Sequence, residues 1–238
     1  MAVNKTAAEH RVRARLGRWP YDDDVAHLVL LDHHMVPDVD DVGSWIAEAR
    51  TQGAHALRTG ALFPPSTPAF VAHGFTAIDE LSLLELAVGN ERRDDRTDVR
   101  VRRLGGSQLE VAAAVDGRAF AAPWANDATA LANIIRATPR SRARYVQLEG
   151  RLVAFSISGQ AATTGYVQRL AVDLAVRRRG LARRLLDDAI DWMRRRDIER
   201  VLVNTATDNV AALALYRSFG FEERPEHLTI FERTLSDR

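Results

Sequence analysis

The chain has 238 residues, of which 46% are hydrophobic and 27% charged, and a formal net charge of +1. This composition is typical of a globular protein with one large or two small domains, and the near-zero charge argues against nucleic acid or a membrane surface as a partner. The absence of cysteine excludes disulfides, thiol nucleophiles and cysteine metal sites, and no apolar run approaches the ~18 residues that span a bilayer, so we expect a cytoplasmic protein.

The first half is predicted to alternate strands with helices. Residues 1–17 lack the apolar stretch of a signal peptide and are interpreted as a frayed or helical lead-in. Apolar runs predict strands, and apolar residues at helical spacing predict helices. The expected strands are 25–31, 56–62 and 77–88, and the expected helices are 38–52 and 64–72.

The order of these elements returns in the second half. Gly74-Phe75 corresponds to Gly220-Phe221 at an offset of 220 − 74 = 146 residues. Further pairs recur at this offset, with one residue of slippage for the last: Thr59 with Thr205, Ala69 with Leu215, Phe70 with Tyr216, and Trp45 with Trp192. We infer an internal repeat, and two α/β units that look alike by chance are the alternative.

If the repeat is real, its first copy has lost the residues that carry chemistry in the second. Phe70 lacks the hydroxyl of Tyr216, Phe63 stands where Asn209 stands, and residues 32–42 contain no arginine-glycine turn. The first half is therefore predicted to be non-catalytic.

The predicted boundary follows from a polar stretch of mixed charge, residues 90–99, which is interpreted as an exposed linker or, alternatively, a surface loop within one domain. We expect residues 1–98 to form a degenerate half-domain with its linker, and residues 99–238 to form a catalytic domain. The adjacent His33 and His34 are interpreted as solvated side chains, and no metal site is expected.

The second half is predicted to be a complete α/β unit. Its expected strands are 100–104, 144–148, 152–158, 166–172 and 200–205, followed by a closing strand pair over 221–235 that is broken near Pro225. Its expected helices are 107–120 with Ser107 as the cap, 127–137, 181–193 and 209–218.

The functional interpretation depends most on residues 165–182, a strand followed by a basic turn and the start of a long helix. Arg177–Arg179, Gly180 and Arg183 gather at the helix N-terminus, where unpaired backbone N–H groups and the helix dipole attract anions. Glycine allows close backbone approach and arginine adds forked donors. The pattern favours a phosphate site, and a solvated basic helix start is the alternative.

This stretch resembles the acyl-CoA-binding motif of the GNAT N-acetyltransferase superfamily, a strand followed by R/Q-x-x-G-x-G/A. The resemblance implies the GNAT acyl-CoA N-acyltransferase fold, an α/β (α+β) architecture with a mixed central sheet flanked by helices, here with an N-terminal degenerate GNAT-like half-domain. It also implies that acetyl-CoA is the co-substrate. The implied cofactor-binding residues are Leu170, Ala171, Val172, Arg177, Arg178, Arg179, Gly180, Leu181, Ala182 and Arg183.

A second motif of many GNAT enzymes, N-x-x-A-x-x-L-Y-x-x-x-G-F, is similar to residues 209–221 at every fixed position. The resemblance implies that Asn209 lies against the cofactor and that Tyr216 lies near the thioester sulfur. The alternatives are a helix cap for Asn209 and a core tyrosine for Tyr216. The implied mechanism is direct attack of a neutral amine on the thioester, with Tyr216, of ordinary pKa near ~10, protonating a thiolate of pKa near ~8.5.

The general base is not identified by either motif. Some relatives carry a glutamate on the strand before the tyrosine helix, where this chain has Asn204, which cannot take a proton. Asp208, Glu226 and His227 are the possible substitutes, and ordinary surface charge is the alternative for each.

The acceptor is suggested only by resemblance. Residues 120–124 and the layout of the domain resemble those of the ribosomal-protein alanine N-acetyltransferases. The pairing of a degenerate first copy with an active second copy resembles tandem GNAT proteins. We expect an acetyl-CoA-dependent N-acetyltransferase, monomeric or homodimeric, that acts on the primary amine of a small molecule or a peptide N-terminus. The alternative is a non-catalytic acyl-CoA-binding regulatory or structural protein.

Overall fold

A computed structural model of the protein describes residues 12–31, 35–89 and 99–235. Packing divides the chain into two compact units, of which unit 1 comprises Met1–Ser82 with Pro225–Arg238 and unit 2 comprises Leu83–Arg224. Two strands, β4 (Thr76–Ala87) and β10 (Glu222–Thr234), contribute residues to both units. The C-terminal residues, which the sequence assigned to the catalytic half, therefore pack with unit 1, and the functional boundary near residue 98 stays a prediction.

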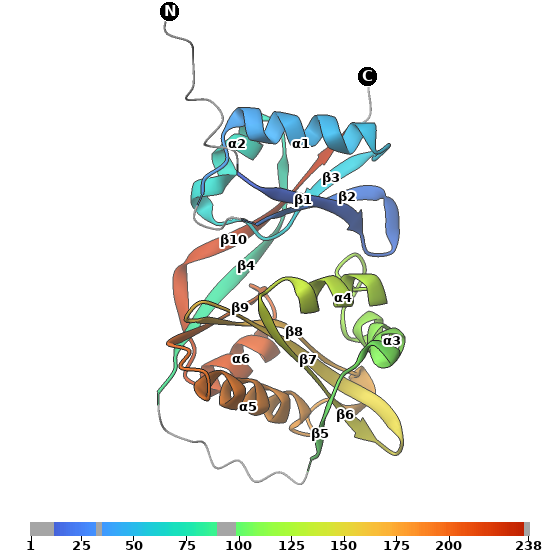
Figure 1. The fold of residues 1–238 in the computed structure, drawn as a ribbon, viewed down its shortest axis with the longest axis vertical. Helices are drawn as coiled ribbons and strands as arrows, with labels where there is room; N and C mark the ends of the chain where they lie inside the picture. Colours follow the sequence, from blue (N-terminus) through green and yellow to red (C-terminus); the bar gives the residue numbers. More distant parts are fainter. Residues whose placement is uncertain (1–11, 32–34, 90–98, 236–238) are drawn as a thin grey trace, which may run out of the picture. The chain divides into compact units, whose positions relative to one another are not determined.

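Unit 1 contains a sheet with the strand order β1-β2-β3-β10-β4 (Figure 1). Strands β2 and β3 are parallel, whereas β1 with β2 and β3 with β10 are antiparallel. The elements besides β4 and β10 are β1 (Ala14–Trp19), β2 (Asp22–Leu30), α1 (Val39–Thr51), β3 (Ala56–Thr59), η1 (Pro64–Ser66) and α2 (Thr67–Ala72). The predicted helices and the strands at 25–31 and 77–88 are confirmed. The strand predicted at 56–62 ends at Thr59, and Leu62 forms an isolated bridge with Thr229.

The expectation of a frayed or helical lead-in is wrong for residues 14–17, which form most of β1. Val12 is buried in the unit 1 core, and Ala14 and Leu16 pack against it. The residues between them are arginines, so the segment alternates apolar and charged side chains with the period of a strand. The high arginine content concealed this pattern. Residues 1–11 lie outside the described residues.

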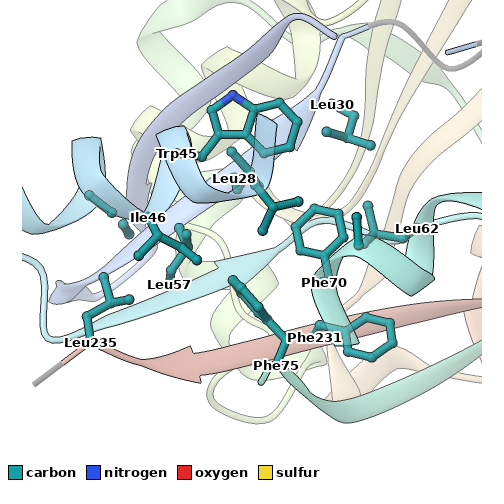
Figure 2. Packing of buried hydrophobic residues seen from close by; sticks show 14 of the residues in the cluster. Leu28, Leu30, Trp45, Ile46, Leu57, Leu62, Phe70, Phe75, Phe231 and Leu235 are labelled. Atoms are coloured by element: carbon teal, nitrogen blue, oxygen red, sulfur yellow. The ribbon is translucent and has the colours of Figure 1, made fainter. Parts of the chain in front are cut away.

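The core of unit 1 is filled from its helices and from both ends of the chain. Trp45 and Ile46 of α1 and Phe70 of α2 pack onto Leu28 and Leu57 of the sheet (Figure 2). Strand β10, the last element of the chain, adds Phe231 to the same cluster, and Leu235 follows it there. Unit 1 is therefore completed by the C-terminal strand.

Unit 2 contains a mixed sheet with the order β4-β9-β8-β7-β6-β5, in which β8 and β9 are parallel and β5 to β8 pair antiparallel in sequence. Its strands besides β4 are β5 (Val101–Arg103), β6 (Arg140–Leu148), β7 (Arg151–Ala161), β8 (Thr164–Val172) and β9 (Arg200–Ala206). Its helices are η2 (Gly106–Gln108), α3 (Leu109–Ala119), α4 (Ala128–Arg136), η3 (Leu174–Val176), α5 (Leu181–Arg194) and α6 (Val210–Ser218). The predicted mixed α/β architecture is confirmed. Within the described ranges, no helix is long and apolar enough to cross a membrane.

Helices cover both faces of this sheet. Helices α3 and α4 bury one cluster with Phe155 and Ile157 of β7, whereas α5 and α6 share another cluster with Val167 of β8. Gly165 allows the close approach of α5, because a Cβ atom at this position would lie 2.6 Å from the sulfur of Met193. The two faces of β8 are thus covered by different helix pairs.

Two expectations for the second half differ from the structure, and two others lie outside the described residues. Ser107 does not cap a helix, because it lies within η2 and α3 begins at Leu109; instead the Gln108 side chain accepts the N–H of Gly105 at 2.9 Å. The closing strand pair is a single strand, β10, which includes Pro225 without a break. The linker prediction for 90–98 and the interpretation of His33 and His34 concern positions outside the described residues.

Candidate active site

The edge between β8 and β9 opens halfway along its length. Their register joins Thr164–Val167 of β8 to Arg200–Val203 of β9. Strand β8 continues to Val172 and β9 continues to Ala206 beyond this register. The backbone groups of residues 168–172 that face β9 therefore lie outside the ladder between the two strands. Such an edge can bind an extended ligand through main-chain hydrogen bonds.

The loop after β8 leads into α5 and leaves the N-terminus of this helix open. The Asp173 carboxylate caps η3 and is held by Arg118 Nε at 2.8 Å. Gly180, with a φ of 75°, is the N-cap of α5 and offers no side chain to the N–H groups of the first turn. The N–H groups of residues 181–183 have no partner within the helix. This helix start has the geometry of an anion site.

The arginines around this helix start have different partners. Arg177 donates from Nη2 to the carbonyl of Ala119, the last residue of α3, at 3.0 Å. Arg183 donates to the Ser218 hydroxyl at 2.9 Å and lies over the ring of Phe219, 5.0 Å from its centroid. The two arginines that follow Arg177 are exposed. Arg177 is exposed as well and Arg183 is half-buried, so three exposed positive charges lie before this helix start.

Asn209 and Tyr216 hold structural positions on α6. Asn209 is the N-cap, since its Oδ1 accepts the N–H of Ala212 at 3.2 Å, and its Nδ2 donates to Thr205 Oγ1 at 3.0 Å. Tyr216 is 5% exposed, and its ring lies 5.6 Å from that of Phe221. Both residues thus have the structural roles that the sequence offered as alternatives. Contact of either with acetyl-CoA stays a prediction.

The acidity of Tyr216 differs from the sequence-based expectation. Burial raises the pKa of Tyr216 to about 12, and the positive charge of Arg169 acts in the opposite direction. The ordinary pKa near ~10 assumed from the sequence is therefore wrong for this fold. None of the described residues forms a hydrogen bond with the Tyr216 hydroxyl. The phenol is a protonated donor across the neutral pH range.

The possible bases belong to different units. Asn204 is exposed at the end of β9, and Asp208 is exposed just before α6. Glu226 and His227 belong to unit 1, where His227 Nδ1 lies 2.8 Å from Glu80 Oε1, whereas Tyr216 belongs to unit 2. Among the residues that the structure describes, no three His, Asp or Glu side chains are grouped to hold a metal.

Arg169, which lies on β8 next to Leu170, belongs to neither of the predicted motifs. Its guanidinium forms a two-pronged ion pair with Asp116 of α3, with Nε–Oδ2 and Nη2–Oδ1 distances of 2.7 and 2.6 Å. The same group lies over the ring of Phe120, 3.5 Å from its centroid. An arginine within an apolar strand was the available signal, because a half-buried charge in a sheet requires a partner.

The residues present fit acetyl-CoA in chemical terms. An open helix N-terminus with exposed arginines suits the pyrophosphate and phosphate groups, and an unpaired strand edge suits an amide-containing arm. A buried, protonated phenol lies on α6 in the same compact unit. The helix start and the phenol belong to the two predicted motifs, 177–182 and 209–221, and the strand edge, residues 168–172, precedes the first of them.

Comparison with known proteins agrees with this assignment. The Acetyltransferase (GNAT) family matches residues 113–221. The chain is 32% identical over 124 residues to the ribosomal protein bS18-alanine N-acetyltransferase of Salmonella typhimurium, a match that covers 50% of this chain and 78% of that protein. It is 29% identical over 127 residues to the Escherichia coli enzyme of the same name, covering 52% of this chain and 80% of that protein.

A solved structure is similar over both units. The tandem GNAT protein from the clavulanic acid biosynthesis pathway has a TM-score of 0.65 and 13% identity, over 94% of this chain and 79% of that chain. This likeness concerns the fold alone, and it extends over the N-terminal half as well. The chain therefore belongs to the GNAT acetyltransferase family, as an acetyl-CoA-dependent N-acetyltransferase with a GNAT-like N-terminal half.

Proposed function

We propose that the chain transfers the acetyl group of acetyl-CoA to the primary amine of a peptide or protein N-terminus, by direct attack and with Tyr216 as the acid. The observation that carries the proposal is the parting of β8 from β9 beyond Val167 and Val203. Along this edge a thioester can be held by main-chain groups in the unit that also carries the open start of α5 and the phenol of Tyr216.

The choice of an N-terminal amine rests on relatives. The curated proteins reported above are named for acetylating an alanine of ribosomal protein bS18. An amine on a small molecule needs the same chemistry at the thioester and is the second acceptor class. The matched relatives favour the peptide, and the experiment below separates the two.

The proposed binding of acetyl-CoA uses main-chain and side-chain groups of unit 2. The N–H groups of residues 181–183 and the side chains of Arg178 and Arg179 receive the pyrophosphate. The β9-facing edge of residues 170–172 pairs with the pantetheine arm, and one of its N–H groups stabilises the negative charge that develops on the carbonyl oxygen. Asn209 contacts the same arm from the start of α6.

The reaction exchanges a C–S bond for a C–N bond. The neutral amine attacks the thioester carbon, the thiolate departs, and the new amide nitrogen loses its extra proton. None of Asp208, Glu226 and His227 combines burial with a place in unit 2, so we propose that ordered water carries this proton to solvent. Tyr216 donates a hydrogen bond to the departing sulfur.

The raised pKa of Tyr216, about 12, limits what this residue can do. Complete proton transfer to a thiolate of pKa near ~8.5 is uphill by roughly 3.5 pKa units, or about 5 kcal/mol. A strong hydrogen bond to the sulfur as charge develops needs no complete transfer. The nearby charge of Arg169 lowers the pKa of Tyr216 and so eases the donation.

The test is an acetyl-CoA consumption assay with matched peptides. Hexapeptides that begin with alanine, serine or methionine are compared with the same peptides blocked at the N-terminus, and with spermidine and glucosamine as small amines. We expect thiol release and a mass gain of one acetyl group only with free peptide N-termini. Turnover with small amines alone would refute the peptide acceptor, and acetyl-CoA binding without any turnover would support a non-catalytic role.

A further inference from the structure

Strand β8 carries a β-bulge that redirects one of its side chains. The register between β7 and β8 shifts between Ile157 and Ser158, which leaves Gln168 as the extra residue. Residues on either side of the bulge pack toward α5. Arg169, which follows the bulge, points instead to Asp116 of α3. The bulge therefore directs a guanidinium to the face of β8 that α3 and α4 cover.

This guanidinium joins three separate pieces of unit 2. It forms the two-pronged pair with Asp116 described above, and its Nη2 donates to the carbonyl of Trp124 at 2.8 Å. It also stacks on the ring of Phe120. Asp116, which is 0% exposed, accepts the backbone N–H of Asn126 at 2.6 Å as well. The end of α3 and the segment from Phe120 to Asn126 are thus fastened to β8 through one ion pair.

Stability alone does not account for this arrangement. A buried ion pair often contributes little more than well-packed apolar side chains of similar volume, because desolvation offsets the attraction. What the pair supplies is geometry, since a forked guanidinium fixes the direction of each hydrogen bond. The segment that it fixes, Phe120–Trp124, includes the exposed residues 121–123.

The position of this segment matters for the acceptor. Tyr216 and α5 pack on one face of β8, so the acid and the helix that receives phosphate approach the thioester from that face. With that face occupied, we infer that the nucleophile reaches a carbonyl at residues 170–172 along the open edge of β8, from the side of the opposite face. Arg169 and the segment Phe120–Trp124 lie on that opposite face.

We propose that Arg169 is a positioning residue for the amine acceptor, and that through Asp116 and the Trp124 carbonyl it fixes the segment Phe120–Trp124 as the wall against which the acceptor binds. The inference rests on the proposed transfer to an amine. It assigns no contact between Arg169 and the reacting atoms. Its consequence is that loss of the two-pronged ion pair raises the KM for the acceptor and leaves the binding of acetyl-CoA intact.

The test compares three variants. Arg169→Gln removes the two-pronged ion pair with Asp116. Arg169→Lys keeps the positive charge near Tyr216 but cannot form both hydrogen bonds of the guanidinium. Arg142→Gln is the matched control, because Arg142 forms an equivalent two-pronged pair with Asp188 at 2.7 and 2.9 Å between β6 and α5. Where Arg169→Gln does not fold, the double variant with Asp116→Asn, which removes both charges, replaces it.

Three measurements are made on each variant. The KM for an alanine-initiated hexapeptide is expected to rise about 10- to 100-fold in both Arg169 variants, because small misplacements of a positioning segment have effects of this size. The Kd for acetyl-CoA should stay within about twofold of the original protein, as expected for a site on the other face. Hydrogen exchange over residues 119–126 should accelerate in the Arg169 variants and not in Arg142→Gln.

Several results would overturn the inference. An unchanged peptide KM, or an equal loss of acetyl-CoA affinity, would show that Arg169 does not act through the acceptor. Full recovery by lysine would show that its charge alone is needed. If the original protein does not acetylate the peptide, the proposed function fails, and unaltered hydrogen exchange over 119–126 would refute the positioning role independently.

Discussion

The two halves of the molecule begin their principal helices in opposite ways. Helix α1 of unit 1 starts with a capping box, in which the Asp38 carboxylate accepts the N–H of Asp41 at 2.8 Å and the Asp41 carboxylate accepts the N–H of Asp38 at 3.3 Å. Helix α5 of unit 2 starts at Gly180, with no side-chain cap and with arginines around it. One helix start is closed by carboxylates that repel phosphate, and the other is open to it.

The ends of the matching short helices are alike in backbone and differ in chemistry. Gly74 and Gly220 both have positive φ, 73° and 85°, and the residue after each glycine donates its N–H to the carbonyl of Phe70 or Tyr216, at 3.1 and 3.2 Å. The two helices therefore end with the same hydrogen bond, at positions that lie 146 residues apart. Phe70 is 0% exposed and Tyr216 is 5% exposed. The two halves therefore share the backbone of this helix end, whereas the carboxylate cap of α1 and the missing hydroxyl of Phe70 are the differences that predict a non-catalytic first half.

The largest expected effect comes from the hydroxyl that distinguishes the two copies. Tyr216→Phe should lower kcat about 1,000-fold, because it removes the hydrogen-bond donor to the departing sulfur, and should leave the Kd for acetyl-CoA nearly unchanged. Phe70→Tyr is the matched control, since it adds a hydroxyl at the equivalent place in unit 1 and should change stability without changing kcat. Steady-state kinetics and calorimetry check both variants. Equal activity of Tyr216→Phe and the original protein would remove Tyr216 from the reaction.

Sequence reasoning recovered the parts of this molecule that local patterns determine. The spacing of Asn209 and Tyr216 predicted a cap and a buried ring on one helix, and the repeat predicted the matching end of α2. The basic turn at Gly180 predicted an open helix start. These features depend on neighbours in the chain, which the sequence displays directly.

The features that escaped prediction depend on distant partners. The bond from Arg169 to Asp116 spans 53 residues and follows from a bulge in β8 that no local pattern marks. The raised pKa of Tyr216 follows from burial by the whole unit. The place of most of β10 in unit 1 likewise depends on a distant partner, because Glu232 of β10 pairs with Arg58 of β3.

The next effect concerns His27, a half-buried histidine of β2 in unit 1. Burial, with help from Arg15 and Arg58, lowers the pKa of His27 from 6.5 to about 4. The folded pKa lies below the unfolded one, so the stabilisation from neutral His27 is fully present above pH 6.5 and is lost as the pH falls toward 4. The difference of about 2.5 pKa units corresponds to about 3 kcal/mol.

Urea titrations between pH 7 and 4, followed by hydrogen exchange in β2, should show that the unfolding free energy of unit 1 falls with pH in the original protein. His27→Gln should flatten the pH dependence, whereas His55→Gln, which changes an exposed histidine 3.8 Å from Asp24 in the same unit, should not. Exchange in β7 of unit 2 reports acid effects that are unrelated to His27. An undiminished acid loss in His27→Gln would place its origin elsewhere.

The smallest effect tests the comparison of helix starts directly. Gly180→Asp gives α5 a carboxylate like the one that closes α1, at a left-handed position that aspartate tolerates better than most residues. The Kd for CoA should rise about tenfold, because the new charge competes with phosphate for the same N–H groups. The melting temperature should fall modestly, since the left-handed backbone at this position strains any residue that has a Cβ atom. Calorimetry and thermal unfolding measure the two quantities.

The reciprocal variant shows which feature of the helix start matters. Asp38→Ala removes the carboxylate from α1 and should cost about 1 kcal/mol of unfolding free energy in unit 1. It should not create a second CoA site, because α1 has neither the glycine turn nor the arginines that precede α5. Two CoA equivalents bound by Asp38→Ala would show that a carboxylate cap alone keeps the first copy empty. One equivalent, together with weaker binding by Gly180→Asp, would show that CoA needs the open glycine turn of α5 and that loss of a carboxylate cap does not replace it.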